Sequence, residues 1–332
     1  MSGLSRRPLA VVTDDRFGDG LALERAVLGP AGVEVVEASC ATSVEVAAAC
    51  RDADAVLANL APVDAAALAA MERCVVVARY GVGLDSVDLA AAAARGVAVR
   101  NVPGYCDTEV AEEVIGLILA LARRIAERDA YVRAGGWNLP AANRRVAGSI
   151  LGVVGFGGTG KALARAALGL GFSAILVHSR RVSAERLEAA LGPAARALGV
   201  RVEAAGLDEL LGRSDWVSLH LPLVSETRGL MDGGRFAAMK EGASFVNTSR
   251  GGLVDEGALA AALRSGRLAG AGLDVFSVEP LPADSPLRGL PNLVFSDHSA
   301  YASRESVAEL RRRTAQNALE ELARAGRLPP RG

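Results

Sequence analysis

The stretch from Ser149 to Leu168 is the most informative about the fold; it reads Ser-Ile-Leu-Gly-Val-Val-Gly-Phe-Gly-Gly-Thr-Gly-Lys-Ala-Leu-Ala-Arg-Ala-Ala-Leu. Its apolar start, 150–154, is typical of a buried parallel strand, and its alanine- and leucine-rich end is typical of a helix. The turn between them carries the residues that we expect to bind a cofactor: Gly155, Gly157, Gly158, Thr159 and Gly160. Glycines at this spacing allow a sharp bend and a close approach of a pyrophosphate to the amides at the helix start. The stretch therefore predicts a dinucleotide-binding strand, turn and helix.

Length and composition limit what this turn can belong to. A chain of 332 residues is long for one compact core, so we expect two domains. Apolar residues make up 51% of the chain and aromatic residues 4%, which suits a helix-rich α/β protein. The formal net charge of −1 provides no long-range field that would attract nucleic acid or an anionic membrane.

The cysteines and the apolar segments bear on the compartment. The four cysteines, Cys40, Cys50, Cys74 and Cys106, are scattered without the spacing of metal ligands and fit a reducing environment. No stretch approaches the roughly 18 unbroken apolar residues of a membrane span, and the N-terminus lacks the apolar core of a signal peptide. We expect a cytoplasmic protein with no metal.

Short apolar runs alternate with helical patterns along the whole chain, which is typical of parallel sheets. In the N-terminal third we expect strands at 9–13, 33–36, 55–60, 75–78 and 97–99. After the glycine turn we expect strands at 174–177, 216–219, 244–247, 271–275 and 293–295. Between these two groups, 109–128 has the apolar spacing of one long helix, and 131–145 reads as a loop that leads into the second domain.

The residues after the second strand of the dinucleotide unit bear on cofactor choice. An NAD site usually places Asp or Glu there to accept hydrogen bonds from the adenosine ribose, whereas this chain has Ser179, Arg180 and Arg181. Serine leaves room, and the arginines can pair with a 2′-phosphate. We therefore expect NADP(H) as the preferred cofactor and keep NAD(H) open. The alternative is a solvated basic loop.

Polar residues follow several of the later strands, at the edge of the sheet where ligands bind in open α/β folds. Arg250, Asp274 and His298 stand at such positions, and Glu279 follows closely after Asp274. Arginine can hold a carboxylate bidentately, and histidine beside a carboxylate can give a proton to a carbonyl oxygen. The set suits reduction of a 2-keto acid. Each residue taken alone also has a structural explanation, and we interpret the other two histidines as structural.

Five motifs in order and spacing resemble those of the D-isomer-specific 2-hydroxyacid dehydrogenases. They are Gly155-Phe-Gly-Gly-Thr-Gly160, the run from Asn247 to Leu259, Gly272-Leu-Asp-Val-Phe276, Glu279-Pro-Leu-Pro282 and His298. The resemblance covers nearly the whole chain and is greatest for the branch that contains phosphoglycerate dehydrogenases and the C-terminal binding protein corepressors. It implies an α/β protein of two Rossmann-like domains with parallel sheets, in which residues 1–105 plus 300–332 form a discontinuous substrate domain and 106–299 the dinucleotide-binding domain. It also implies a homodimer.

The resemblance assigns roles to individual residues. Arg250, Glu279 and His298 would be catalytic, and Asp274 would contact the nicotinamide amide. Further cofactor contacts are expected at Leu221, Pro222, Thr248 and Ser249. The substrate carboxylate would be received by the backbone amides of four residues: Tyr80, Gly81, Val82 and Gly83. The alternative is that this segment is a turn that binds no ligand. The side chain of the substrate would be read by Asn59 and its loop to residue 63, Tyr80, Trp137 and Tyr301.

Two functions of different kinds remain open from the sequence. In the first, the protein reduces small 2-keto acids or aldehydes, such as glyoxylate or hydroxypyruvate, with NADPH. In the second, it is a cofactor-sensing binding protein like the corepressors, whose dehydrogenase fold serves assembly. The intact set of Arg250, Glu279 and His298 favours the enzyme, although the corepressors also keep that set.

Overall fold

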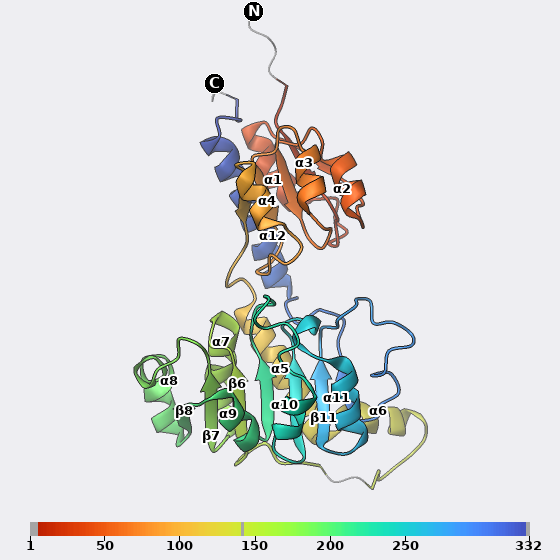
Figure 1. Ribbon diagram of the computed structural model, residues 1–332, viewed down its shortest axis with the longest axis vertical. Helices are drawn as coiled ribbons and strands as arrows, with labels where there is room; N and C mark the ends of the chain where they lie inside the picture. The colour runs from red at the N-terminus through yellow and green to blue at the C-terminus, as the bar shows by residue number, and fades with distance from the viewer. Residues whose placement is uncertain (1–5, 141–142, 330–332) are drawn as a thin grey trace, which may run out of the picture. The chain divides into compact units, whose positions relative to one another are not determined.

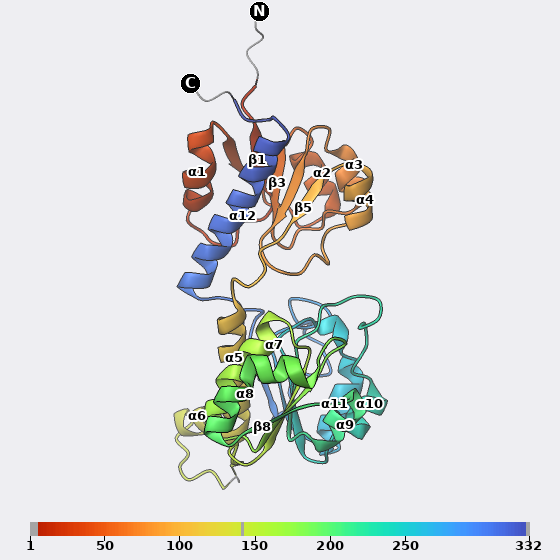
Figure 2. The same ribbon diagram turned by 90° about the vertical axis from the view of Figure 1, so that its left-hand side faces the viewer.

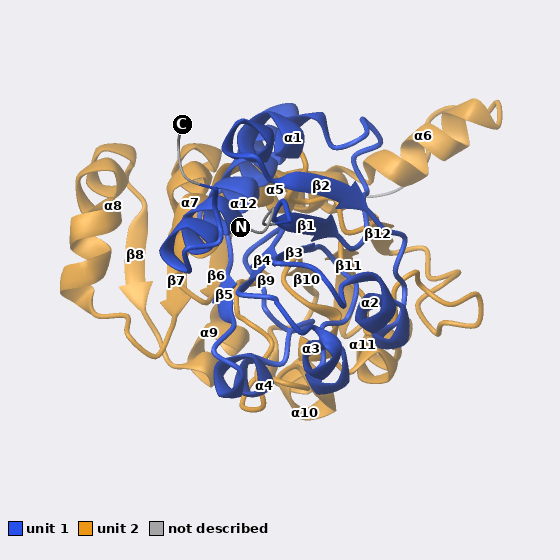
Figure 3. Cartoon of the chain, turned by 90° about the horizontal axis from the view of Figure 1, so that it is seen from above, with its two compact units in different colours: residues 1–105, 303–332 blue, residues 106–302 orange. Residues whose placement is uncertain are grey.

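The computed structural model describes residues 6–140 and 143–329, so the ends of the expected substrate domain, 1–5 and 330–332, lie outside the described residues (Figure 1). Contacts divide the chain into two compact units, which Figure 3 colours separately. We call Met1–Tyr105 with Ser303–Gly332 unit 1, and Cys106–Ala302 unit 2. Both units contain a sheet whose strands are all paired in parallel, which confirms the expected α/β class with two parallel sheets.

Unit 1 is built on a five-stranded sheet in the order β2-β1-β3-β4-β5. The strands are β1 (Leu9–Val12), β2 (Glu34–Glu37), β3 (Ala55–Ala58), β4 (Val76–Arg79) and β5 (Ala98–Arg100). The helices are α1 (Ala22–Leu28), α2 (Ser43–Ala49), α3 (Ala65–Ala70), α4 (Leu89–Ala94) and α12 (Arg304–Arg324), with the 3-10 turn η1 (Gly29–Ala31). Helices α1 and α12 lie on one face of the sheet, and α2, α3 and α4 lie on the other (Figure 2). Buried side chains of each set pack against the sheet.

Unit 2 is built on a seven-stranded sheet in the order β12-β11-β10-β9-β6-β7-β8. The strands are β6 (Ile150–Val154), β7 (Ala174–His178), β8 (Arg201–Ala204), β9 (Trp216–Leu219), β10 (Ala243–Asn247), β11 (Leu268–Leu273) and β12 (Leu293–Phe295). The helices are α5 (Asp107–Arg123), α6 (Ile125–Arg133), α7 (Gly158–Ala167), α8 (Ala184–Leu198), α9 (Leu207–Arg213), α10 (Gly233–Ala238) and α11 (Glu256–Arg264). Two 3-10 turns, η2 (Leu168–Leu170) and η3 (Gly251–Leu253), complete the unit.

The strand order of unit 2 explains why the glycine turn is central. The order of the strands along the sheet reverses at β6, which has β7 on one side and β9 on the other, although all strands run in parallel. Ligands of open α/β sheets bind outside the carboxyl ends of the strands at such a reversal. Four of the five residues of β6 are fully buried, because α5, α7 and α8 pack on one face of the sheet and α9, α10 and α11 on the other.

The prediction of one continuous helix over 109–128 is wrong, because the helix is broken in two. The chain forms two helices, α5 and α6, separated by Arg124 in the left-handed conformation at φ 54°. Apolar periodicity continues across Arg124 through Ile125, so the pattern alone gave no sign of the break. α6 then extends to Arg133, into the segment that was expected to be a loop.

Candidate functional site

The glycine turn after β6 is closed by contacts that exclude side chains. Gly155 has a φ of 107°, and a Cβ there would lie 2.1 Å from the carbonyl oxygen of His220, just after β9. A Cβ on Gly160 would lie 2.2 Å from the carbonyl oxygen of Gly155. Real Cβ atoms do not approach backbone that closely, so both positions require glycine. The end of β9 therefore packs directly against the turn.

The outer side of the same turn is open. Gly157 is exposed, and a Cβ there would meet nothing within 4 Å. α7 begins at Gly158, so its unpaired amides and the positive end of its dipole lie beside this open backbone. One carboxylate lies close by, because a Cβ on Gly158 would be 2.2 Å from Oδ2 of Asp107. Burial first, and then the charge of Glu109, raise the pKa of Asp107.

The loop after β7 is more basic than the sequence motif suggested. Ser179 is half-buried, while Arg180 and Arg181 are exposed. Arg186, in the first turn of α8, donates from its guanidinium to the carbonyl oxygen of Arg181 at 2.8 Å. The guanidinium of Arg186 is therefore a third positive charge beside those of Arg180 and Arg181, which were predicted from the sequence. The short spacing between Arg181 and Arg186 was the signal that could have found it. Glu226 carries the opposing charge, and Arg180 contributes to the lowered pKa of that carboxyl, after hydrogen bonds from its own backbone and Ser225.

The expected cofactor residues beyond the glycine turn follow β9 and β10. Leu221 is half-buried and Pro222 exposed, just past the end of β9. Ser249 donates its hydroxyl to the carbonyl oxygen of Leu219 at 2.7 Å, which ties the end of β10 to that of β9. Thr248 is only 9% exposed, and its Oγ1 has no hydrogen-bond partner among the described residues. A buried hydroxyl without a partner is costly, so this atom fits a polar group of a bound ligand.

The structure brings His298 and Glu279 together. Nδ1 of His298 lies 2.6 Å from Oε2 of Glu279, and about a third of each side chain is exposed. The other oxygen of Glu279 accepts the backbone N–H of Phe276 at 2.9 Å. Partial burial raises the pKa of Glu279, but the hydrogen bonds from His298 and Phe276, with the charges of His298 and Arg250, outweigh burial and lower it. Glu279 is therefore held as a carboxylate.

Arg250 lies at the end of β10, near enough for its charge to act on Glu279. Its guanidinium donates to the carbonyl oxygen of Ser249 at 2.7 Å, and its own carbonyl oxygen accepts from the side-chain amide of Asn247 at 2.9 Å. The three residues predicted from the sequence to be catalytic thus belong to one group within unit 2.

Asp274 lies at the end of β11 and is 1% exposed. Its two carboxylate oxygens accept the backbone N–H groups of Ser299 at 2.9 Å and Ala300 at 3.1 Å, while its carbonyl oxygen accepts that of His298 at 2.8 Å. His298 itself has a φ of 58°, which is uncommon for a residue with a side chain. Asp274 therefore holds the strained turn that presents His298. The expected contact of Asp274 with a nicotinamide stays a prediction.

In unit 1, the expected carboxylate-binding loop follows β4. The backbone N–H of Tyr80 donates to the carbonyl oxygen of Ala58 at 2.8 Å, and its hydroxyl donates to buried Glu24 at 3.0 Å. The ring is 1% exposed. Tyr80 therefore has neither an amide nor a side chain to offer a substrate. Its prediction as a substrate-binding residue was wrong, because the hydrogen bonds between β3 and β4 continue one residue past the end of β4. The amides of Gly81, Val82 and Gly83 donate to no backbone acceptor in the described chain.

The remaining expected substrate contacts differ in their surroundings. Asn59 is 8% exposed, and its backbone N–H donates to the carboxylate of Asp14 at 3.0 Å. The ring of Tyr301 lies 6.5 Å from that of His298, edge to face. Trp137 lies beyond α6, which follows the end of α5 far from the glycine turn, and its side chain is 75% exposed. In space, the 17 residues of α5 lie between the glycine turn and the segment that carries Trp137, and the expected contact of Trp137 with a substrate stays a prediction.

The other two histidines have the structural surroundings that were expected. Nδ1 of His178 lies 3.1 Å from the carbonyl oxygen of Ala205. His220 is buried, with Nε2 at 3.0 Å from the hydroxyl of Ser218 and Nδ1 at 3.3 Å from that of Thr159. Burial lowers the pKa of His220 to about 4, so its ring is neutral at physiological pH.

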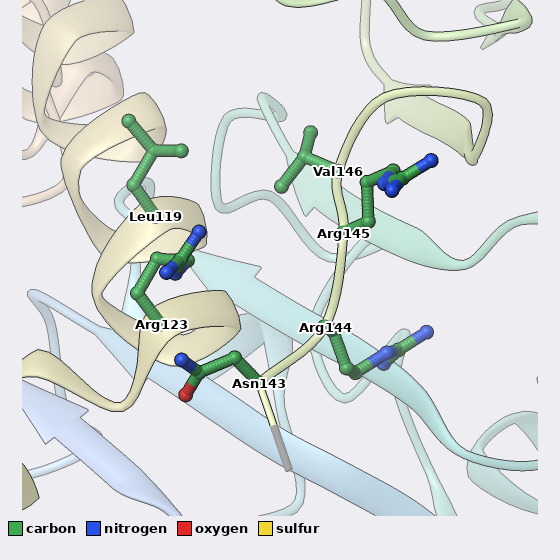
Figure 4. A pocket seen from close by; sticks show the side chains of 6 residues that line it. All are labelled: Leu119, Arg123, Asn143, Arg144, Arg145 and Val146. Carbon is green, nitrogen blue, oxygen red and sulfur yellow. The ribbon is translucent and has the colours of Figure 1, made fainter.

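A pocket of about 270 Å³ lies at the opposite edge of the sheet, near the amino ends of the strands. Its lining comes from the end of α5 and the segment before β6, as Figure 4 shows: Leu119, Arg123, Asn143, Arg144, Arg145 and Val146. Arg144 donates to the carbonyl oxygen of Gly242 at 2.7 Å and lies over the ring of Trp216. The pocket is thus separate from the group around His298.

Neither a metal-binding cluster nor a membrane-spanning helix is found among the described residues. No group of three or more His, Cys, Asp or Glu side chains there could hold a metal ion. No helix in the part of the chain that the structure describes is long and apolar enough to cross a membrane.

Similarity to known proteins identifies the family of this chain. Residues 115–300 match the family described as D-isomer specific 2-hydroxyacid dehydrogenase, NAD binding domain. The chain is also 40% identical to a glyoxylate reductase of Korarchaeum cryptofilum over 286 residues. These residues cover 84% of this chain and 82% of that protein. The chain belongs to the D-isomer-specific 2-hydroxyacid dehydrogenase family. The resemblance seen in the sequence is confirmed.

Further relatives agree with this membership. A D-3-phosphoglycerate dehydrogenase of Mycobacterium leprae is 41% identical over 287 residues, which cover 85% of this chain and 51% of that protein, so the chain spans about half of it. A solved structure of a protein from Thermus thermophilus is 34% identical, with a TM-score of 0.84 over 97% of this chain and 98% of that one. A glyoxylate reductase structure from Paecilomyes thermophila is 27% identical, with a TM-score of 0.83 over 97% of each chain. The protein is an NAD(P)-dependent oxidoreductase of 2-hydroxy acids, and the enzyme predicted from the sequence is confirmed.

Proposed function

We propose that this dehydrogenase is a reductase of small 2-keto acids that prefers NADPH and uses His298 as its proton donor. The observation that carries the proposal is the 2.6 Å contact between Nδ1 of His298 and Oε2 of Glu279, beside the charge of Arg250. The relatives reported above are named as reductases and dehydrogenases, so we favour the enzyme over a corepressor-like binding protein.

The roles of the three residues follow from their contacts. When bound, the nicotinamide supplies or accepts the hydride at the substrate carbon. Glu279 accepts the hydrogen bond from Nδ1–H of His298 and stabilises the positive charge of the ring, which leaves Nε2 to hold the proton that moves to the substrate oxygen. Arg250 offers a planar guanidinium, which suits a bidentate hold on a carboxylate. Asp274 fixes the backbone of the turn that aims His298.

The cofactor-binding residues of the proposal are those of the glycine turn and the strand ends around it. The open backbone at Gly157 and the amides at the start of α7 suit a pyrophosphate, and the unpartnered hydroxyl of Thr248 suits a further polar group of the dinucleotide. Arg180, Arg181 and Arg186 would pair with a 2′-phosphate. The absence of an acidic residue at Ser179 supports the preference for NADPH over NADH, although Glu226 opposes it.

We propose the amides of Gly81, Val82 and Gly83 as the group that receives the substrate carboxylate. They are unpaired with backbone acceptors, and successive amides of this kind form a concave anion site. The Arg79 side chain adds positive charge there, since a Cβ on Gly81 would overlap its guanidinium. Asn59 and Tyr301 remain our candidates for reading the rest of the substrate.

We further propose that a second copy of the chain covers α6, giving a homodimer. α6 has no buried residue, and Ile125 and Val132 on it are 53% and 51% exposed. Exposed apolar side chains that gather on one surface can mark a contact with another protein. The cytoplasmic location stays our proposal, supported by four free, buried cysteines.

The test is consumption of NADPH, followed by its absorbance, with glyoxylate, hydroxypyruvate and larger 2-keto acids as substrates. We expect turnover with at least one small 2-keto acid and a lower Michaelis constant for NADPH than for NADH. Tight cofactor binding without turnover of any of them would instead favour the binding protein.

A further inference from the structure

Three side chains beside the glycine turn form a chain of hydrogen bonds that the catalytic roles above do not use. Ser218 lies in β9, His220 just after β9, and Thr159 in the first turn of α7. Oγ of Ser218 lies 3.0 Å from Nε2 of His220, and Nδ1 of the same ring lies 3.3 Å from Oγ1 of Thr159. His220 is 8% exposed and Ser218 is fully buried, whereas Thr159 reaches the surface in part. These hydrogen bonds thus lead from the core to the start of α7.

Burial determines the direction of these hydrogen bonds. A neutral imidazole has one N–H donor and one acceptor nitrogen. The hydroxyl of Ser218 has no other acceptor among the described residues, so its hydrogen goes to Nε2 of His220. In the opposite tautomer that buried hydrogen would have no partner, which is unfavourable because a buried donor loses its hydrogen bonds to water without a replacement. Nε2 is therefore the acceptor, and Nδ1 carries the proton and donates to Thr159.

The direction of these hydrogen bonds determines what Thr159 can do at the surface. Because Thr159 accepts from His220, its hydroxyl hydrogen is left to donate outward, and it has no acceptor among the described residues. The position of His220 is fixed, because its backbone packs against Gly155 and its Cβ lies within 3.4 Å of a Cβ built on Gly160. The ring stays neutral over the physiological range, since burial lowers its pKa to about 4.

We propose that Ser218, His220 and Thr159 form a one-way hydrogen-bond relay that ends in a donor at the start of α7, and that this donor serves an oxygen of the cofactor pyrophosphate. A phosphate oxygen only accepts hydrogen bonds, so a relay fixed in this direction favours it over a group that must donate. Ser218 and His220 are positioning residues, because they act through Thr159. The inference rests on the proposed function only in that the glycine turn holds a dinucleotide.

The first test of the relay is the tautomer of His220, measured by nitrogen NMR of the imidazole in the full-length protein without cofactor. We expect a protonated Nδ1 and an unprotonated Nε2. A proton on Nε2 would overturn the relay, whatever the enzyme binds.

The second test measures binding of ADP-ribose and of adenosine by calorimetry. Thr159→Val should weaken ADP-ribose binding about ten- to a hundredfold, the usual effect of a hydrogen bond to a charged group, while Thr159→Ser keeps the hydroxyl and binds as the parent does. His220→Leu should weaken it in the same direction, and His220→Asn, whose amide can replace Nδ1–H, should restore much of it. Adenosine has no phosphate, so its affinity should not change.

Equal losses with both ligands, or none with ADP-ribose, would overturn the relay. Neither ligand carries a 2′-phosphate or is turned over, so this outcome is separate from a failure of the proposed NADPH preference or of keto-acid reduction.

Discussion

Nδ1 of His298 lies 2.6 Å from Oε2 of Glu279, although 18 residues separate them in the chain. Two independent supports hold this contact. The backbone N–H of Phe276 fixes the other oxygen of Glu279, and Asp274 fixes the turn after β12 from which His298 projects. A catalytic acid needs such support because small displacements of the donor cost much of the rate.

The Glu279→Gln variant tests the charge of this pair. Glutamine keeps the shape but removes the negative charge beside Nδ1 of His298, so kcat for reduction should fall on the order of tenfold or more at neutral pH. The pKa of Glu279 is lowered, so the carboxylate remains charged until the pH falls below its ordinary value of 4.5, and the parent enzyme should show no loss of kcat/KM from this group above that pH. Turnover of the variant at neutral pH and the profile of kcat/KM against pH for the parent measure the two effects. Near-parental turnover in the variant would contradict the role of Glu279.

The Arg180→Ala variant tests the preference for NADPH. A phosphate partner is worth about 1.5–3 kcal/mol, so the Michaelis constant for NADPH should rise on the order of tenfold or more while that for NADH changes little. Arg181→Ala and Arg186→Ala should act in the same direction. Arg196→Ala, on the exposed end of α8 where it pairs with Glu188, is the matched control. Equal effects on the two cofactors would refute the basic loop as a 2′-phosphate site.

The Asp107→Asn variant tests the carboxylate beside the glycine turn. Its negative charge lies next to Gly158, where an anionic pyrophosphate is proposed to bind, so its removal should lower the dissociation constant of NADPH several-fold. The pKa of Asp107 is raised, so in the parent protein the charge is lost, and binding tightens, as pH falls but while it is still above the ordinary carboxyl value of 3.8. Binding measured by fluorescence against pH shows both effects. If the variant binds NADPH more weakly, Asp107 supports the site instead.

His220 predicts a pH dependence of stability. The ring has a pKa of about 4 when folded and an ordinary value of 6.5. Between these values the unfolded chain binds a proton that the folded chain does not, so stability falls as pH falls, by about 3 kcal/mol over the window. Denaturant unfolding of the parent and of His220→Asn from neutral to acid pH isolates this contribution, because the carboxylates titrate in both. Parallel curves would mean that the folded ring is accessible to protons.

Much of the site could be predicted because its residues sit at ends of strands. Arg250, Asp274 and His298 each follow a parallel strand, and the carboxyl ends of parallel strands meet at one edge of a sheet. The glycine spacing in the turn after β6 likewise reflects contacts that only glycine permits.

What the sequence did not reveal depends on contacts between distant segments or on single backbone angles. Nothing in the apolar periodicity indicates that Arg124 ends α5 in a left-handed conformation. β8 was not predicted, since Arg201–Ala204 is a short edge strand with charged residues and no buried run. The loss of the Tyr80 amide to Ala58 depends on the register between β3 and β4, and the contact of Asp107 with Gly158 on the packing of α5 against α7.

The role of His298 as proton donor is tested most directly by the turnover number of His298→Ala with saturating NADPH and the best 2-keto acid, measured together with NADPH binding. We predict a fall on the order of a hundredfold or more with NADPH affinity and thermal stability close to those of the parent enzyme. Near-normal turnover in this variant would contradict the assignment of His298 as the proton donor.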